Sequence, residues 1–118
     1  MREPARDIER LVHIKESIDR INRYMNGVTM DMLLADDMRY YAVVKNIEII
    51  GEAANMLTFE FRENHPATPW KMIVGMRNYI THEYFQIKPA VVQEVLMQDL
   101  PELAEQIEAY LEEIKAEQ

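Results

Sequence analysis

The chain has no cysteine, three glycines and five prolines among its 118 residues. The absence of cysteine excludes disulfides, thiolate metal sites and a cysteine nucleophile. With few glycines and prolines, the chain has few of the turn residues that connect strands in β-rich domains. Met, Leu, Ala, Glu, Ile and Gln, which favour helix or are compatible with it, are abundant. We therefore expect an all-α fold, in a single domain over residues 1–118.

Long apolar runs are also missing, since no segment approaches the roughly 18–20 apolar residues needed to cross a bilayer. The first ten residues, MREPARDIER, are charged and lack the hydrophobic core of a secretory signal. With the absence of cysteine, these features predict a cytoplasmic protein without a membrane partner.

The charge is strongly negative but unevenly distributed. A formal net charge of −8 argues against a protein that coats nucleic acid without specificity. Residues 90–118 carry eight acids and one base, whereas residues 69–89 carry three bases and one acid. The locally basic segment contains GMRNYITHEYF, residues 75–85, in which an arginine, a histidine and a tyrosine lie close together.

The spacing of apolar residues predicts an antiparallel bundle of four main helices with one or two short helices. We expect the main helices over residues 4–25, 37–61 and 69–84, and from residue 99 onward. Thr68 and Pro69 have the character of a helix start, and Asp99 and Glu102 have the spacing of a capping box. A thin stretch of small residues around Gly51 would let a neighbouring backbone approach closely.

The helix expected over residues 69–84 would carry a line of polar residues on the side away from the core. At about 100° per residue, Gly75, Asn78 and His82 fall within about 60° of one another. They form an open floor with an amide and an imidazole, and we expect Gly75 and Asn78 to support RNA binding there. Arg77 lies about 140° from His82. Either the helix is distorted or ends here, so that the long arginine reaches around, or a second copy of the chain completes the site.

Arginine and histidine together suit metal-free cleavage of RNA. Histidine transfers protons near neutral pH, and arginine holds a phosphate and stabilises charge that develops on it. The 2′-OH of RNA would be the nucleophile, which DNA lacks. With no carboxylate cluster or second imidazole nearby in sequence, we expect no metal and no cofactor. The same residues also fit the polar face of an ordinary helix, so spacing alone leaves both interpretations open.

The segment RNYITHEY, Arg77 to Tyr84, resembles the RxxxxHxY motif of HepT-like toxins in the HEPN superfamily. Three segments resemble the family's helices in the same order, and the resemblance covers roughly residues 5–115. These segments are IEIIGEAANML (47–57), PWKMIVGMRNYITHEYFQI (69–87) and DLPELAEQI (99–107).

This resemblance implies a HEPN-like helical bundle that forms a homodimer, with two motifs facing each other in a cleft. It implies a metal-independent endoribonuclease with Arg77 and His82 as the catalytic pair and Asn78 as a supporting polar residue. The products would carry 2′,3′-cyclic phosphate and 5′-OH ends. A minimal nucleotidyltransferase antitoxin, the partner in a type II toxin-antitoxin pair, would silence the toxin by adding AMP to Tyr84.

Two other functions are compatible with the sequence. The chain could be a non-catalytic HEPN nucleotide-binding or accessory subunit of a nucleotidyltransferase complex, or a helical dimerisation domain. His13 and His65 lack a comparable context and are interpreted as structural or solvent-exposed.

Overall fold

The computed structural model describes the backbone of residues 6–82 and 88–117 and the side chains of residues 6–77 and 88–117. Within these ranges the chain forms helices and no strand, which confirms the all-α class. The four main helices are α1 (Asp7–Met25), α3 (Asp37–Asn55), α5 (Trp70–His82) and α7 (Leu100–Glu117). The shorter elements are α2 (Met30–Leu34), α4 (Phe59–Asn64), α6 (Pro89–Glu94) and the π-helical turn η3 (Val95–Asp99).

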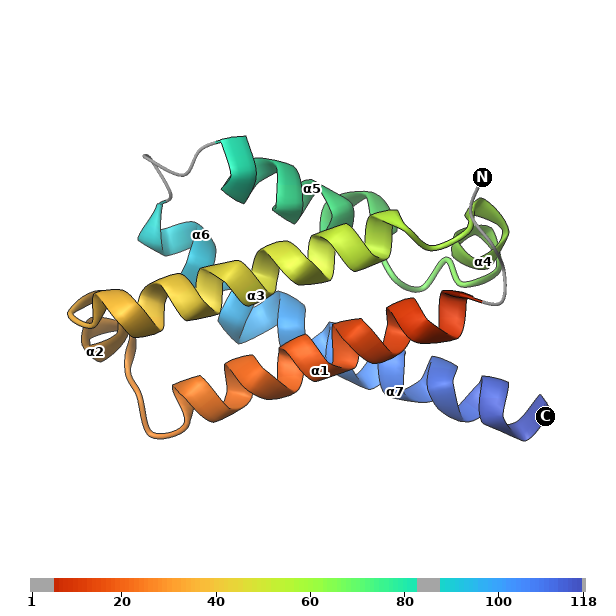
Figure 1. Ribbon diagram of the computed structural model, residues 1–118, viewed down its shortest axis with the longest axis horizontal. Helices are drawn as coiled ribbons and strands as arrows, with labels where there is room; N and C mark the ends of the chain where they lie inside the picture. The colour runs from red at the N-terminus through yellow and green to blue at the C-terminus, as the bar shows by residue number, and fades with distance from the viewer. Residues whose placement is uncertain (1–5, 83–87, 118) are drawn as a thin grey trace.

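Helix α3 is the centre of the bundle. It lies antiparallel to α1 on one side and packs against α5 on the other, while α7 packs against α1 (Figure 1). Apolar residues of all four main helices form one buried cluster, which includes an apolar seam along α1. Leu11, Ile14, Ile18 and Ile21 of this seam are at most 3% exposed.

The helix expected over residues 37–61 is interrupted, so that prediction is wrong at its C-terminal end. α3 ends at Asn55, and α4 begins after Thr58, whose hydroxyl accepts a hydrogen bond from the Phe61 N–H at 3.1 Å. The buried carboxylate of Asp7 accepts hydrogen bonds from the N–H and the hydroxyl of Thr58, at 2.9 and 2.7 Å. Hydrogen bonds to a charged group contribute about 1.5–3 kcal/mol. A contact between residues 51 positions apart therefore fixes this break.

The last helix does not start with the expected capping box. The chain stays helical from Pro89 through η3 into α7, and Asp99 lies inside the π-helical turn. The Leu100 N–H bonds the Val95 carbonyl, five residues back. Pro101 has no N–H and its ring crowds the carbonyl four residues earlier, so a wider turn accommodates it without ending the helix.

Thr68 also differs from its expected role as a helix cap. Its hydroxyl donates to Gln106 Oε1 at 2.7 Å and contacts the Tyr110 hydroxyl at 2.6 Å, both on α7. At the start of α5 the Trp70 N–H instead bonds the Thr68 carbonyl at 2.8 Å. Thr68 therefore joins two helices, because its buried hydroxyl needs partners and α7 supplies them.

The close approach expected near Gly51 is present, and the neighbour is α5. A Cβ built on Gly51 would lie 2.8 Å from the Arg77 nitrogen and 3.0 Å from its Cα. No real Cβ tolerates such contacts with a backbone, so glycine is what allows α3 and α5 to pack at this separation.

A pair of glycine substitutions tests this contact. We expect Gly51→Ala to lower the free energy of unfolding by about 1–3 kcal/mol, because the new methyl group pushes α5 away. Gly75→Ala is the matched control, since a Cβ at Gly75 meets no atom within 4 Å. It should raise stability by up to about 1 kcal/mol through helix propensity. Urea unfolding followed by circular dichroism measures both, and equal effects of the two changes would contradict the packing argument.

Candidate functional site

Helix α5 carries the RxxxxHxY motif as far as His82. Its backbone is α-helical at every position from Trp70 to His82, so no break separates Arg77 from His82. An arginine reaching around a distorted helix, one of the two explanations offered above, is thus not supported by the backbone. The side chains of Asn78 and His82, and all of Tyr84, lie outside the described residues.

Arg77 is placed by α3. Its backbone lies against Gly51, and its Nη1 lies 3.3 Å from Oε1 of Glu52, the next residue of α3. The Arg77 side chain is 23% exposed and that of Glu52 is 53% exposed. An ion pair this open to water contributes at most about 1 kcal/mol to stability. Its main consequence is orientation, because the carboxylate holds the guanidinium towards α3.

Gly75 lies on a different face of α5 from Arg77. It lies beside a cavity of about 540 Å³ that Phe59, Trp70 and Val74 help to line. It also borders a second cavity, of about 270 Å³, against η3. The space beside Gly75 agrees with the open floor that its spacing predicted. The structure nevertheless does not bring Gly75 and Arg77 together on one face.

Asp99 of η3 lines the second of these cavities, opposite Gly75. Its partial burial raises the pKa of this carboxyl above the usual value, and the nearby charges of Glu94 and Glu102 raise it further. The carboxyl therefore holds its proton to a higher pH than an exposed aspartate does.

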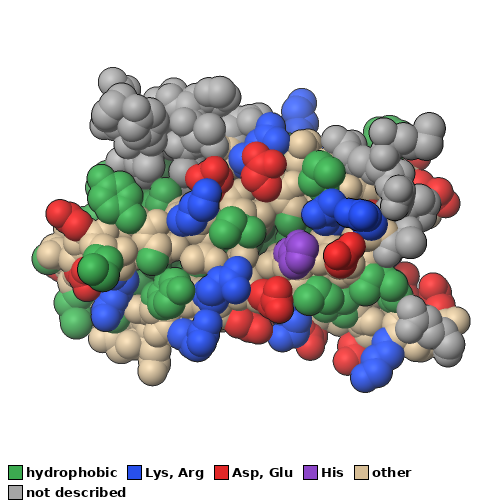
Figure 2. All heavy atoms as spheres, in the orientation of Figure 1, with side chains coloured by type: hydrophobic (Ala, Val, Ile, Leu, Met, Phe, Trp, Pro, Cys, Tyr) green, Lys and Arg blue, Asp and Glu red, His purple; other side chains and the backbone are tan. Residues whose placement is uncertain are grey.

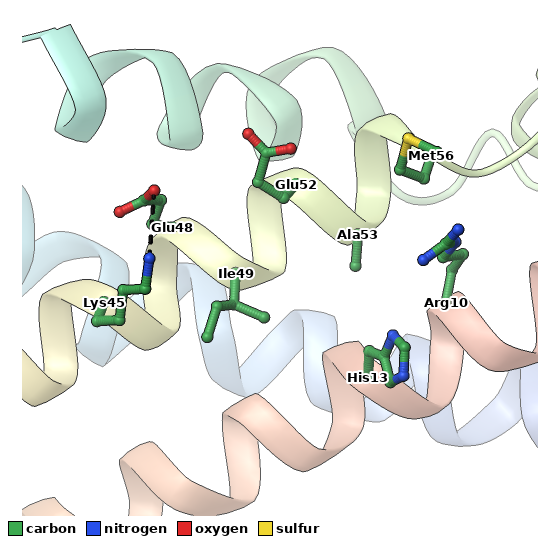
Figure 3. Close-up of a pocket in the computed structure, with 8 residues that line it drawn as sticks. All are labelled: Arg10, His13, Lys45, Glu48, Ile49, Glu52, Ala53 and Met56. Atoms are coloured by element: carbon green, nitrogen blue, oxygen red, sulfur yellow. Dashed lines mark ion pairs between the residues drawn. The ribbon is translucent and has the colours of Figure 1, made fainter.

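A further cavity, of about 250 Å³, lies between α1 and α3. Arg10 and His13 project into it from α1, and Glu52, the partner of Arg77, lines it from α3 (Figure 3). Arg10 was not among the residues expected to be functional, and His13 was expected to be structural or solvent-exposed. Their separation of three residues on one helix, outside the buried seam, is the pattern that would have pointed to them.

The charges over the α1–α3 face are mixed. Basic and acidic side chains alternate across it, with apolar side chains among them (Figure 2). The face is therefore no continuous basic surface, and a nucleic acid would have to be held at particular points.

His65 has a structural environment. Its ring stacks on Phe61 with centroids 4.0 Å apart, and its Nδ1 lies 2.8 Å from the Phe61 carbonyl. Its Nε2 lies 3.2 Å from Glu113 Oε1. With both ring nitrogens in contact with acceptors, His65 ties the end of α4 to α7.

In the described part of the chain, no group of three or more His, Cys, Asp or Glu side chains is arranged to hold a metal ion. Among its helices, none combines the length and apolar character needed to cross a membrane.

Comparison with known proteins identifies the family. The model of the family described as "Ribonuclease HepT-like" matches residues 14–110. A protein of Caldanaerobacter subterraneus subsp. tengcongensis named "Putative RNase TTE0752" is 35% identical over 105 residues, covering 89% of this chain and 94% of that protein. "Probable ribonuclease HepT" of Thermococcus cleftensis is 31% identical over 93 residues, covering 79% and 84%. No solved structure gives a significant match. The chain therefore belongs to the HepT-like ribonuclease family.

Proposed function

We propose that the protein is the toxin of a type II toxin-antitoxin pair and a metal-independent endoribonuclease acting in the cytoplasm. The observation that carries this proposal is the placement of Arg77. The arginine of the RxxxxHxY motif is anchored at the α3–α5 contact, with its guanidinium held by Glu52 at 3.3 Å. Membership of the HepT-like ribonuclease family supports the same reaction class.

In the proposed mechanism the RNA supplies its own nucleophile. The His82 imidazole removes the proton from a ribose 2′-OH, and the 2′-oxygen attacks the adjacent phosphorus. The bond to the 5′-oxygen of the next nucleotide breaks, and this oxygen leaves with a proton. The Arg77 guanidinium stabilises the negative charge on the phosphoryl oxygens. The products carry a 2′,3′-cyclic phosphate and a 5′-OH.

The active unit in this proposal is a homodimer. Because α5 is regular between Arg77 and His82, one helix directs the two residues about 140° apart. A two-fold pair of α5 helices would place both kinds of side chain in one shared cleft. Asn78 and Gly75 would lie along the path of the RNA in that cleft.

The proposed control is covalent. A minimal nucleotidyltransferase antitoxin would add AMP to the Tyr84 hydroxyl, with the nucleotide's phosphorus forming the new bond and pyrophosphate leaving ATP. The added phosphate beside the cleft would repel and obstruct RNA.

Cleavage of single-stranded RNA in EDTA tests the reaction. The purified protein should produce 5′-OH ends, and Arg77→Ala or His82→Ala should lower the rate at least about 100-fold, because each removes transition-state stabilisation. Gel electrophoresis of end-labelled RNA measures the rate. Cleavage that survives both substitutions would remove these residues from the mechanism. Nucleotide binding without cleavage under any condition would instead favour the accessory-subunit function.

The role of Glu52 as a positioning residue generates a second test. We expect Glu52→Gln to lower kcat about 10-fold with little change in KM, because Arg77 loses the carboxylate that orients it. Glu112→Gln on α7 is the control, since it makes the same charge change on an exposed side chain. An unchanged kcat for Glu52→Gln would contradict the positioning role, and a higher kcat would show that Glu52 competes with RNA for the arginine.

Intact-mass measurement tests the proposed modification. Protein co-expressed with a minimal nucleotidyltransferase of the proposed antitoxin class should gain one or more AMP units, and Tyr84→Phe should prevent this because the acceptor hydroxyl is gone. Tyr41→Phe, which removes an exposed hydroxyl on α3, is the control and should leave the adducts unchanged. AMP found on the Tyr84→Phe variant would place the modification elsewhere.

A further inference from the structure

We propose that the cavity between α1 and α3 is a binding site for a phosphate group, with Arg10 and His13 as its hydrogen-bond donors. Its use by an RNA strand rests on the proposed ribonuclease function, whereas the binding of phosphate does not. The site is separate from the motif residues on α5 and is linked to them by Glu52, which lines the cavity and pairs with Arg77.

The two donors lie on one face of α1. Arg10 and His13 are three residues apart, so their side chains are neighbours one above the other. Both project towards α3 and into the cavity (Figure 3). The guanidinium and an imidazole N–H can together supply several donors to one phosphate, in the geometry that arginine uses for this group.

The carboxylates of this cavity already have cationic partners. Glu48 Oε1 lies 3.6 Å from Lys45 Nζ, and Glu52 Oε1 lies 3.3 Å from Arg77 Nη1. The described side chains offer Arg10 no ion pair or hydrogen bond. The positive charge of Arg10 is thus the one in this cavity that no carboxylate neutralises, so the site attracts an anion.

Partial burial of the Arg10 side chain also has a free-energy cost, which a bound anion would offset. Its Nε is shielded from solvent and meets no hydrogen-bond acceptor among the described residues. A buried donor without a partner destabilises the folded state, more so when the group is charged. In a chain with 21 acidic residues, an arginine left without a carboxylate partner is conspicuous. A phosphate oxygen drawn into the cavity would give the guanidinium the acceptor that the folded chain does not provide.

The cavity has the size and walls that such a ligand needs. Its volume of about 250 Å³ equals that of about eight water molecules, which leaves room for a phosphate group and part of a sugar. Ile49, Ala53 and Met56 form apolar walls. These walls lower the local dielectric constant and so strengthen the attraction between Arg10 and an anion.

The connection through Glu52 suggests how the site would serve cleavage. Glu52 lines the cavity from α3, while its carboxylate points towards α5 and holds Arg77 there (Figure 3). A strand with one phosphate in the α1–α3 cavity and another at Arg77 would cross α3 at Glu52. The cavity would thereby set the register of the RNA relative to the reacting linkage.

Fluorescence anisotropy with a labelled, single-stranded, all-2′-deoxy oligonucleotide tests the site, because this probe lacks the hydroxyl that cleavage requires. Arg10→Gln should raise Kd about 10-fold, and His13→Gln about 3-fold. Arg10→Gln should also reduce the slope of log K against log salt concentration by about 0.7, as expected for one lost phosphate contact with a single strand. Arg10→Lys should restore part of the affinity.

Arg23→Gln is the matched control, since it removes the same charge from an exposed position on α1 outside the cavity. Direct titration with AMP and with inorganic phosphate, followed by calorimetry, distinguishes the source of the phosphate. If Arg10→Gln weakens the binding of only these small ligands, the phosphate site stands and its ligand is a free nucleotide or phosphate. If Arg10→Gln behaves like Arg23→Gln with every probe, the arginine merely packs on the cavity wall and the proposal is wrong.

Failure of this proposal is distinguishable from failure of the proposed function. Loss of cleavage in Arg77→Ala, with binding of the deoxy probe still weakened by Arg10→Gln, concerns the reaction alone. Loss of probe binding in a folded Arg10→Gln variant, shown by an unchanged urea midpoint, concerns the cavity alone.

Discussion

The contact between Gly51 of α3 and the backbone of α5 at Arg77 is the constraint on which the arrangement of the site depends. Without a Cβ at Gly51, α5 approaches α3 so closely that an added methyl carbon would lie 2.8 Å from the Arg77 nitrogen. The close approach puts Arg77 beside Glu52, and their charged groups meet at 3.3 Å. A packing requirement of the core thus determines where the guanidinium of the motif points.

The same helix α3 connects two chemically different faces. On one side it holds Arg77 through Glu52, and on the other it contributes Glu52 to the cavity that Arg10 and His13 line. Pairing of each carboxylate with a neighbouring cation leaves Arg10 with unbalanced positive charge. An acidic protein can therefore present local anion-binding points, because the arrangement of charges and not their sum decides the local field.

Expectations based on local sequence were wrong where a distant residue or a proline determines how a helix ends or continues. The helix expected to reach residue 61 ends at Asn55, since the Asp7 carboxylate of α1 accepts two hydrogen bonds from Thr58. The capping box expected at Asp99 is absent because the helix continues through a π-helical turn just before Pro101. Helix propensity and residue spacing describe one segment at a time. They therefore carry no information about a hydrogen-bond partner on another helix.

The sequence by itself determined the all-α class, the four main helices, the close approach at Gly51 and the motif that relates the chain to HepT-like ribonucleases. These features follow from periodicity, residue size and a short pattern, which are local properties of the chain. The tertiary structure alone decided that Arg77 pairs with Glu52, that Gly75 opens to a different face, and that Arg10 and His13 share a cavity with Glu52. Such contacts join residues far apart in sequence, and their geometry exists only once the helices have packed.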